Sequence, residues 1–108
     1  MTFTVREMPK AKQDKRGIFL WLHQHSPTGA ADWLDAYDAL LDQLAEQASL
    51  YGEAPERRVC ELPIRQTFFK TRRGRVYRAI FFIERSDVFV LRVRGPGQAP
   101  VLPHDILK

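Results

Sequence analysis

The sequence predicts an α+β domain with two layers, in which a helical hairpin packs on a small, mainly antiparallel sheet in the order β-α-α-β-β-β. Three observations lead to this prediction. Residues 29–49 form a long amphipathic stretch, Ser26-Pro27 marks a helix start directly after another helical stretch, and three strand-like runs follow in the second half of the chain. We expect one domain over residues 1–108, with an irregular tail over 96–108.

The N-terminal part of the chain contains one expected strand and one expected helix. Residues 2–8 alternate apolar and polar side chains, as a short strand does, and Pro9 ends the run. Residues 10–25 place apolar side chains at helical spacings, although Gly17 weakens a helix by about 1 kcal/mol relative to alanine. We therefore expect a strand followed directly by a helix.

The second helix has the clearest pattern in the sequence. Ser26 offers a hydroxyl at the N-cap, and Pro27 suits the first helical position. The apolar stripe consists of Trp33, Tyr37, Leu40, Leu41, Leu44 and Ala48, and the other side carries Asp32, Asp35, Asp38, Asp42 and Glu46. Carboxylates repeated along an amphipathic helix are usually its solvated face, so we expect no metal site there.

Three strands are expected after a loop. The loop covers 50–58, and the strand-like runs cover 59–69, 75–84 and 88–94. Pro63 cannot donate a hydrogen bond to a neighbouring strand, so the first run starts late, bulges or lies at a sheet edge. The intervening turns are Arg72-Arg73-Gly74 and Arg85-Ser86-Asp87.

Alternation along the last two strands predicts which side chains face the helices. We expect Phe89, Leu91 and Val93 to face the helices, and Val88, Val90, Arg92 and Arg94 to face away. In the preceding strand, one alternating set consists of Val76, Arg78, Ile80 and Phe82. If that set also faces away from the helices, Arg78, Arg92 and Arg94 share one open, positively charged surface.

The positive charge is concentrated in residues 57–94. The net charge is +4, but residues 30–56 carry seven acidic residues and no Lys or Arg, whereas residues 57–94 carry eleven basic residues against three acidic ones. Ten of those eleven are arginines, whose planar fork suits phosphate and carboxylate recognition. A polyanionic partner is one interpretation; the other is that exposed arginines keep a small sheet soluble and its edges unpaired.

Several classes of protein are not expected. No continuous apolar run is longer than five residues, as at Ile18–Leu22, which is far short of a membrane span, and the first sixteen residues show no apolar stretch typical of a secretory signal. Cys60 is the only cysteine, so neither an intrachain disulfide nor a CxxC metal site is possible. We expect a cytoplasmic protein without a cofactor or metal, in which Cys60 is a small core residue.

Short motifs in a fixed order resemble the RelE/ParE toxin superfamily. They are Ala11-x-x-Asp14 at the start of the first helix, Ser26-Pro27 leading into Ala30-Ala31-x-Trp33, and the segment Gly74–Gly95. The resemblance covers about residues 2–98, and its most specific part is the tyrosine-arginine strand followed by a polar turn and a valine-rich strand. It implies a toxin of a bacterial type II toxin–antitoxin pair, a plasmid stabilisation protein neutralised by a cognate antitoxin.

The superfamily divides by target, and the resemblance implies different residue roles for each. RelE-like members are metal-independent endoribonucleases that cut mRNA on the ribosome, and Arg78 matches the arginine that holds their scissile phosphate. Lys70 lies near their preceding lysines, and His104 is a candidate acid or base. ParE-like members inhibit DNA gyrase. The residues expected to bind a target or nucleic acid are Arg72, Arg73, Arg75, Arg92 and Arg94.

Two departures from the RelE pattern favour the ParE-like mode. The C-terminal arginine and the late tyrosine that RelE-like nucleases use have no clear match, because residues 95–100 read G-P-G-Q-A-P and no tyrosine follows them. A ribosome-dependent mRNA endonuclease stays open as the alternative. A non-toxic domain that binds nucleic acid or protein is the third hypothesis.

Overall fold

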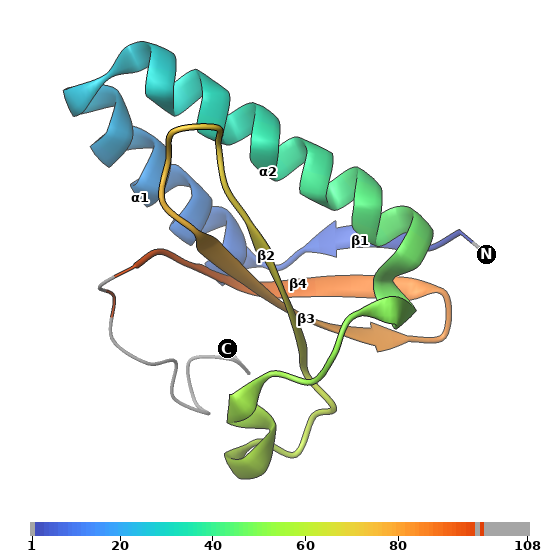
Figure 1. Ribbon diagram of the computed structural model, residues 1–108. Coiled ribbons are helices and arrows are strands. Elements are labelled where there is room, and N and C mark those ends of the chain that lie inside the picture. Colours follow the sequence, from blue (N-terminus) through green and yellow to red (C-terminus); the bar gives the residue numbers. More distant parts are fainter. Residues whose placement is uncertain (1, 97, 99–108) are drawn as a thin grey trace.

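A computed structural model describes residues 2–96 and 98 of the chain. Most of the tail expected to be irregular, residues 97 and 99–108, lies outside these residues, and so does the candidate His104. The elements, labelled in Figure 1, are the strand β1 (Thr4–Glu7), the helices α1 (Pro9–His25) and α2 (Pro27–Gln47), the short 3₁₀ helices η1 (Ala48–Leu50) and η2 (Pro55–Val59), and the strands β2 (Arg65–Phe69), β3 (Tyr77–Glu84) and β4 (Asp87–Arg94). The predicted α+β class and the order of strands and helices are confirmed.

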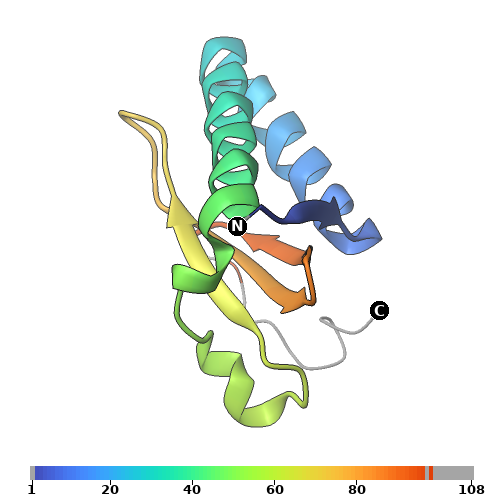
Figure 2. The ribbon, with the colours of Figure 1, turned by 90° about the vertical axis from the view of Figure 1, so that its right-hand side faces the viewer.

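The four strands form one mixed sheet in the order β1-β4-β3-β2. β1 runs parallel to β4, and the other two pairs are antiparallel. The helical hairpin covers one face of this sheet, and the segment that carries η2 lies on the other side (Figures 1 and 2). None of the helices in the described part of the chain is both long enough and apolar enough to cross a membrane.

The start of α2 is as the sequence predicts. The Ser26 hydroxyl accepts a hydrogen bond from the Gly29 amide at 3.0 Å, and Pro27 takes the first helical position. The α1 helix runs through Gly17 without interruption. Because only Ser26 separates the two helices, they form the predicted hairpin and lie side by side over the sheet (Figure 2).

Each face of the sheet has its own apolar cluster. On the helix side, the buried residues include Trp33, Tyr37, Leu40, Leu44, Ala79, Phe81, Val88, Val90 and Val93. The cluster on the opposite side, called the outer face below, consists of Ala54, Cys60, Ile64, Ile80 and Leu91. The run predicted as a strand from residue 59 becomes a strand only at Arg65, two residues after Pro63, and Cys60 is buried as predicted.

The prediction for the facing of β4 is wrong for four residues. Val88 and Val90 pack under the helices, whereas Phe89 and Leu91 lie with the outer cluster. The cause is a β-bulge: Ile80 pairs with Arg92 but Phe81 pairs with Val90, so Leu91 is an extra residue. Counting backward from Val93, which does face the helices, therefore assigns the wrong face to every residue before the bulge. Ile80 and Phe82 lie with the outer cluster, so the condition stated for their alternating set is met.

Candidate functional site

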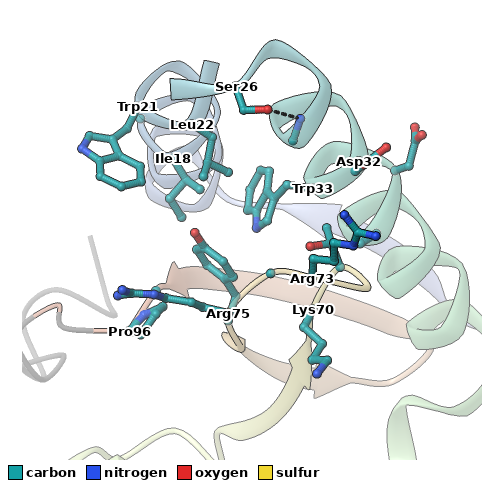
Figure 3. Close-up of a pocket in the computed structure, with 18 of the residues that line it drawn as sticks. Ile18, Trp21, Leu22, Ser26, Asp32, Trp33, Lys70, Arg73, Arg75 and Pro96 are labelled. Atoms are coloured by element: carbon teal, nitrogen blue, oxygen red, sulfur yellow. Dashed lines mark hydrogen bonds between the residues drawn. The ribbon is translucent and has the colours of Figure 1, made fainter. Parts of the chain in front are cut away.

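A groove of about 1610 Å³ runs between the helical hairpin and the connection from β2 to β3 (Figure 3). This connection, residues 70–76, is called the arm below. Figures 1 and 2 show that the arm reaches beyond the end of the sheet to the level of the helices. The groove is therefore formed by segments that lie far apart in the sequence.

The two walls of the groove carry opposite charges. The arm contributes Lys70, Arg72, Arg73 and Arg75, all of them exposed. Within residues 2–96 and 98, no hydrogen bond or ion pair engages these four side chains. The facing part of α2 contributes Asp32 and Asp35, which are also exposed. A ligand in the groove would meet cations on one flank and carboxylates on the other.

The floor of the groove is apolar and aromatic. Ile18, Leu22 and Trp33 point into it from the two helices (Figure 3). Trp33 is only 1% exposed and meets the Tyr77 ring edge-on, with the ring centroids 5.5 Å apart. Burial raises the pKa of Tyr77, and the charge of Arg75 opposes this shift, so its hydroxyl stays protonated. Trp21 stands at the rim with 59% of its surface exposed, a position typical of a protein contact.

Arg78 is not part of an open cationic surface. Its two Nη atoms donate to the Glu56 carboxylate at 2.8 and 2.6 Å, and Nη1 also donates to Gln66 Oε1 at 3.1 Å. The Arg78 side chain is 20% exposed and that of Glu56 is 12% exposed. Arg78 donates hydrogen bonds to the Glu56 carboxylate and thereby lowers its pKa, although burial of the carboxylate opposes the shift. The pair is therefore ionised at neutral pH.

Arg92 is engaged in the same way by Asp14 on α1. Arg92 donates to the Asp14 carboxylate from Nε at 2.7 Å and from Nη2 at 2.9 Å. The same carboxylate accepts the Val93 amide at 2.9 Å, at a point where β4 extends beyond its pairing with β1. Asp14 thus fastens α1 to the edge of β4. The predicted open surface of Arg78, Arg92 and Arg94 is wrong, because carboxylates inside the domain bind the first two.

The remaining candidates lie in different places. Arg94 is half-buried beside a smaller pocket of about 330 Å³, which Arg78 also lines, whereas Lys70 lines the groove. Glu56 and Asp14 are the site residues whose pairing the sequence does not reveal. Asp14 stands out as part of a helix-start motif, but Glu56 lies in a loop with no pattern that indicates a contact with Arg78.

The groove offers exposed cations, carboxylates and an apolar floor to a ligand. No group of three or more potential metal ligands is found among residues 2–96 and 98. The two histidines of α1, His23 and His25, line neither the groove nor the smaller pocket, and His25 Nδ1 lies 2.8 Å from the carbonyl oxygen of Trp21. The arrangement of exposed cations, apolar floor and opposite carboxylates is suited to hold a polypeptide segment.

Comparison with known proteins agrees with the resemblance seen in the sequence. The family model for the ParE toxin of the type II toxin–antitoxin system, parDE, matches residues 5–100. A search of curated proteins found no match. Among solved structures, the chain is similar to one from the toxin–antitoxin complex RelBE2 of Mycobacterium tuberculosis, with 23% sequence identity and a TM-score of 0.47, over 88% of this chain and 99% of that chain. Because the family model covers most of the sequence, this chain belongs to the ParE toxin family of type II toxin–antitoxin systems.

Proposed function

We propose that this toxin arrests growth by binding a protein target, DNA gyrase, and that it does not cleave RNA itself. The observation that carries the proposal is the bidentate bond between Arg78 and Glu56. In the RelE-like nucleases that the sequence resembles, the matching arginine holds the scissile phosphate. A guanidinium whose two Nη atoms are bonded to a carboxylate cannot hold a phosphate in the same way.

The other requirements of RNA cleavage also lack support. Attack by a ribose hydroxyl needs a base within hydrogen-bond reach of that hydroxyl, a cation beside the phosphate and an acid within reach of the leaving oxygen. Lys70 lines the groove, whereas Arg78 lines the smaller pocket. His104 lies outside the described residues. The two cations that the resemblance assigns to cleavage therefore line different pockets, and the carboxylate beside Arg78, that of Glu56, is bonded to its guanidinium.

The arm and groove are the surface that we expect to contact the target and the antitoxin. Arg72, Arg73 and Arg75 are exposed and Trp21 stands at the rim, so the surface combines unpaired charge with an aromatic anchor. A cognate antitoxin would neutralise the toxin by laying an acidic segment with apolar side chains into the groove. Such a segment would cover the arginines and the floor together, and so deny both to the target.

Two purified assays test the target. We expect the wild-type toxin to inhibit DNA supercoiling by gyrase and to leave mRNA uncut in the presence of ribosomes. The R72A/R73A/R75A variant should lose inhibition by at least about tenfold, because it removes three exposed cations from the proposed contact surface. The R78A variant should retain inhibition, provided that a melting curve shows it folded.

A charge-matched control separates a specific surface from net charge. The K12A/R16A/R58A variant removes three exposed cations that lie outside the groove, and it should inhibit gyrase as the wild type does. Ribosome-dependent cuts in mRNA that disappear in R78A would instead establish the endonuclease. Normal growth of cells that express the toxin without any antitoxin would favour the non-toxic binding domain.

A further inference from the structure

The two walls of the groove carry charges that complement each other. We propose that the free toxin forms a homodimer through this groove, with the arm of each copy against the helical hairpin of the other. The groove is then occupied by a second copy of this chain, and self-association covers the surface that we assign to the target. This inference goes beyond the proposed function, because it concerns a contact between two toxin chains that closes the toxin to its target.

The opposite charges of the groove do not contact each other within one chain. The arm carries four exposed cations and α2 carries the exposed Asp32 and Asp35. Among residues 2–96 and 98, no hydrogen bond or ion pair engages any of these side chains. The groove of about 1610 Å³ lies between the two sets. Each set is therefore available to opposite charges from another molecule.

A two-fold axis along the groove brings each wall of one copy against the oppositely charged wall of the other. A half-turn about this axis makes the second groove face the first and exchanges its two sides, so the arm of each copy faces the hairpin of its partner. Positions along the groove do not change in this rotation. The contact is isologous, as in most homodimers, so the same attraction occurs twice.

The order of residues along the groove fits this pairing. Figure 3 shows Asp32 and Arg73 toward one end of the groove, and Trp21 and Arg75 toward the other. In the dimer, Asp32 of each copy forms an ion pair with Arg73 of the other, and Trp21 offers its ring to Arg75. Trp21 has a ring face for this contact, because it is 59% exposed although His25 lies against it with the centroids 4.3 Å apart.

A second copy matches both walls and the floor of the groove at once. An acidic segment, as proposed for the antitoxin, pairs with the arm but leaves Asp32 and Asp35 without opposite charges. A second copy supplies cations to these carboxylates and carboxylates to the arm. The facing grooves also shield the half-buried Ile18 and Leu22 of the apolar floor from water, which favours association. The charge pattern of this groove therefore favours a second copy of the chain.

Sedimentation velocity of the full chain tests the dimer through two charge reversals. D32R/D35R reverses the α2 wall and R73E/R75E reverses the arm, so each variant repels a copy of itself at both contacts. At about 100 μM protein and about 50 mM salt, we expect the wild type to dimerise and each variant alone to stay monomeric. An equimolar mixture of the two variants should form dimers again, because every reversed charge then meets its opposite.

The matched control reverses two carboxylates of α2 that lie outside the groove. D38R/D42R changes exposed positions by the same total charge and should dimerise as the wild type does. Raising the salt to about 500 mM should weaken the wild-type dimer at least about tenfold, because exposed charges are then screened. A monomeric wild type, a dimer that is unchanged by salt or that survives either groove reversal, or a mixture that does not associate would each overturn the proposal.

Thermal melts show whether each variant is folded. If a charge reversal does not fold, the neutral variants D32N/D35N and R73Q/R75Q replace the pair. Each should weaken the dimer at least about fivefold, because each removes the attraction at both symmetric contacts, and an unchanged dimer would refute the proposal. The measurement contains no gyrase, so failure of the dimer and failure of the proposed target are distinguished.

Discussion

Two groups of arginines lie at the same end of the sheet, and their surroundings differ. Arg72, Arg73 and Arg75 on the arm are exposed, with no hydrogen bond or ion pair in the described part of the chain. Arg78 and Arg92 on the strands each bind a carboxylate with two hydrogen bonds, and their side chains are only 20% and 11% exposed. The same residue type therefore supports the fold on the strands and is available for binding on the arm.

The difference follows from where the backbone places each side chain. A strand residue in a two-sided sheet projects toward a packed layer, where an unpaired charge is costly and a carboxylate partner is required. The arm extends beyond the end of the sheet, so its guanidinium groups stay hydrated and need no internal partner (Figure 2). Four variants, taken from the largest expected effect to the smallest, test this division.

The largest loss of stability is expected at Trp33, a buried residue of the core between the helices and the sheet. Trp33→Ala removes a residue that is 1% exposed, and we expect a loss of about 3–5 kcal/mol in the free energy of unfolding. Urea denaturation measures this loss of unfolding free energy. A loss below about 1 kcal/mol would mean that the helical hairpin does not pack on the sheet as described.

Asp14→Ala tests whether Arg92 supports the fold. The substitution removes the carboxylate that accepts hydrogen bonds from the mostly buried Arg92 guanidinium and from the Val93 amide, so we expect a loss of about 2–4 kcal/mol in the free energy of unfolding. The control is Asp42→Ala on the exposed face of α2, which should change stability by less than about 0.5 kcal/mol. Similar melting curves for the two variants would place Arg92 with the arm arginines instead.

Glu56→Gln tests the second strand pair through its pH dependence. Because the hydrogen bonds from Arg78 lower the pKa of Glu56, this pair stabilises the fold fully above the ordinary carboxyl pKa. The stabilisation is lost as the pH falls through the lowered pKa. We expect the variant to lose about 1–3 kcal/mol at neutral pH and to show a flatter decline toward acid. Parallel wild-type and variant curves of unfolding free energy against pH would contradict the pairing.

The arm arginines should contribute least to stability. The R72A/R73A/R75A variant removes exposed charges without internal partners, so we expect its unfolding free energy to stay within about 0.5 kcal/mol of the wild type. A thermal melt beside the gyrase assay separates the two roles. Loss of stability together with loss of inhibition would mean that the arm, too, supports the fold.

Much of the local structure could be predicted from the amino-acid pattern. The Ser26 cap, the apolar stripe of α2 and the turns between the last strands are short-range features, in which a residue and its near neighbours specify the backbone. The extra residue at Leu91 was not predictable in this way. A bulge depends on how two strands align over their whole length. It reverses the facing of the β4 residues before it, and because residues 88–91 are all apolar, their sequence does not mark which side chains face the helices.

The candidate site shows the same contrast between features that depend on neighbouring residues and features that depend on distant ones. The arm cations and Trp21 are visible as a cluster and an apolar run in the sequence, because their exposure needs no distant partner. Amino-acid order alone specifies the α+β class, the cationic stretch over residues 57–94 and the family resemblance, since each depends on composition and spacing along the chain. Folding decides which arginines remain available for binding a partner. Glu56 lies 22 positions from Arg78 and Asp14 lies 78 positions from Arg92 in the sequence. Only tertiary packing brings groups so far apart in the chain within hydrogen-bond distance.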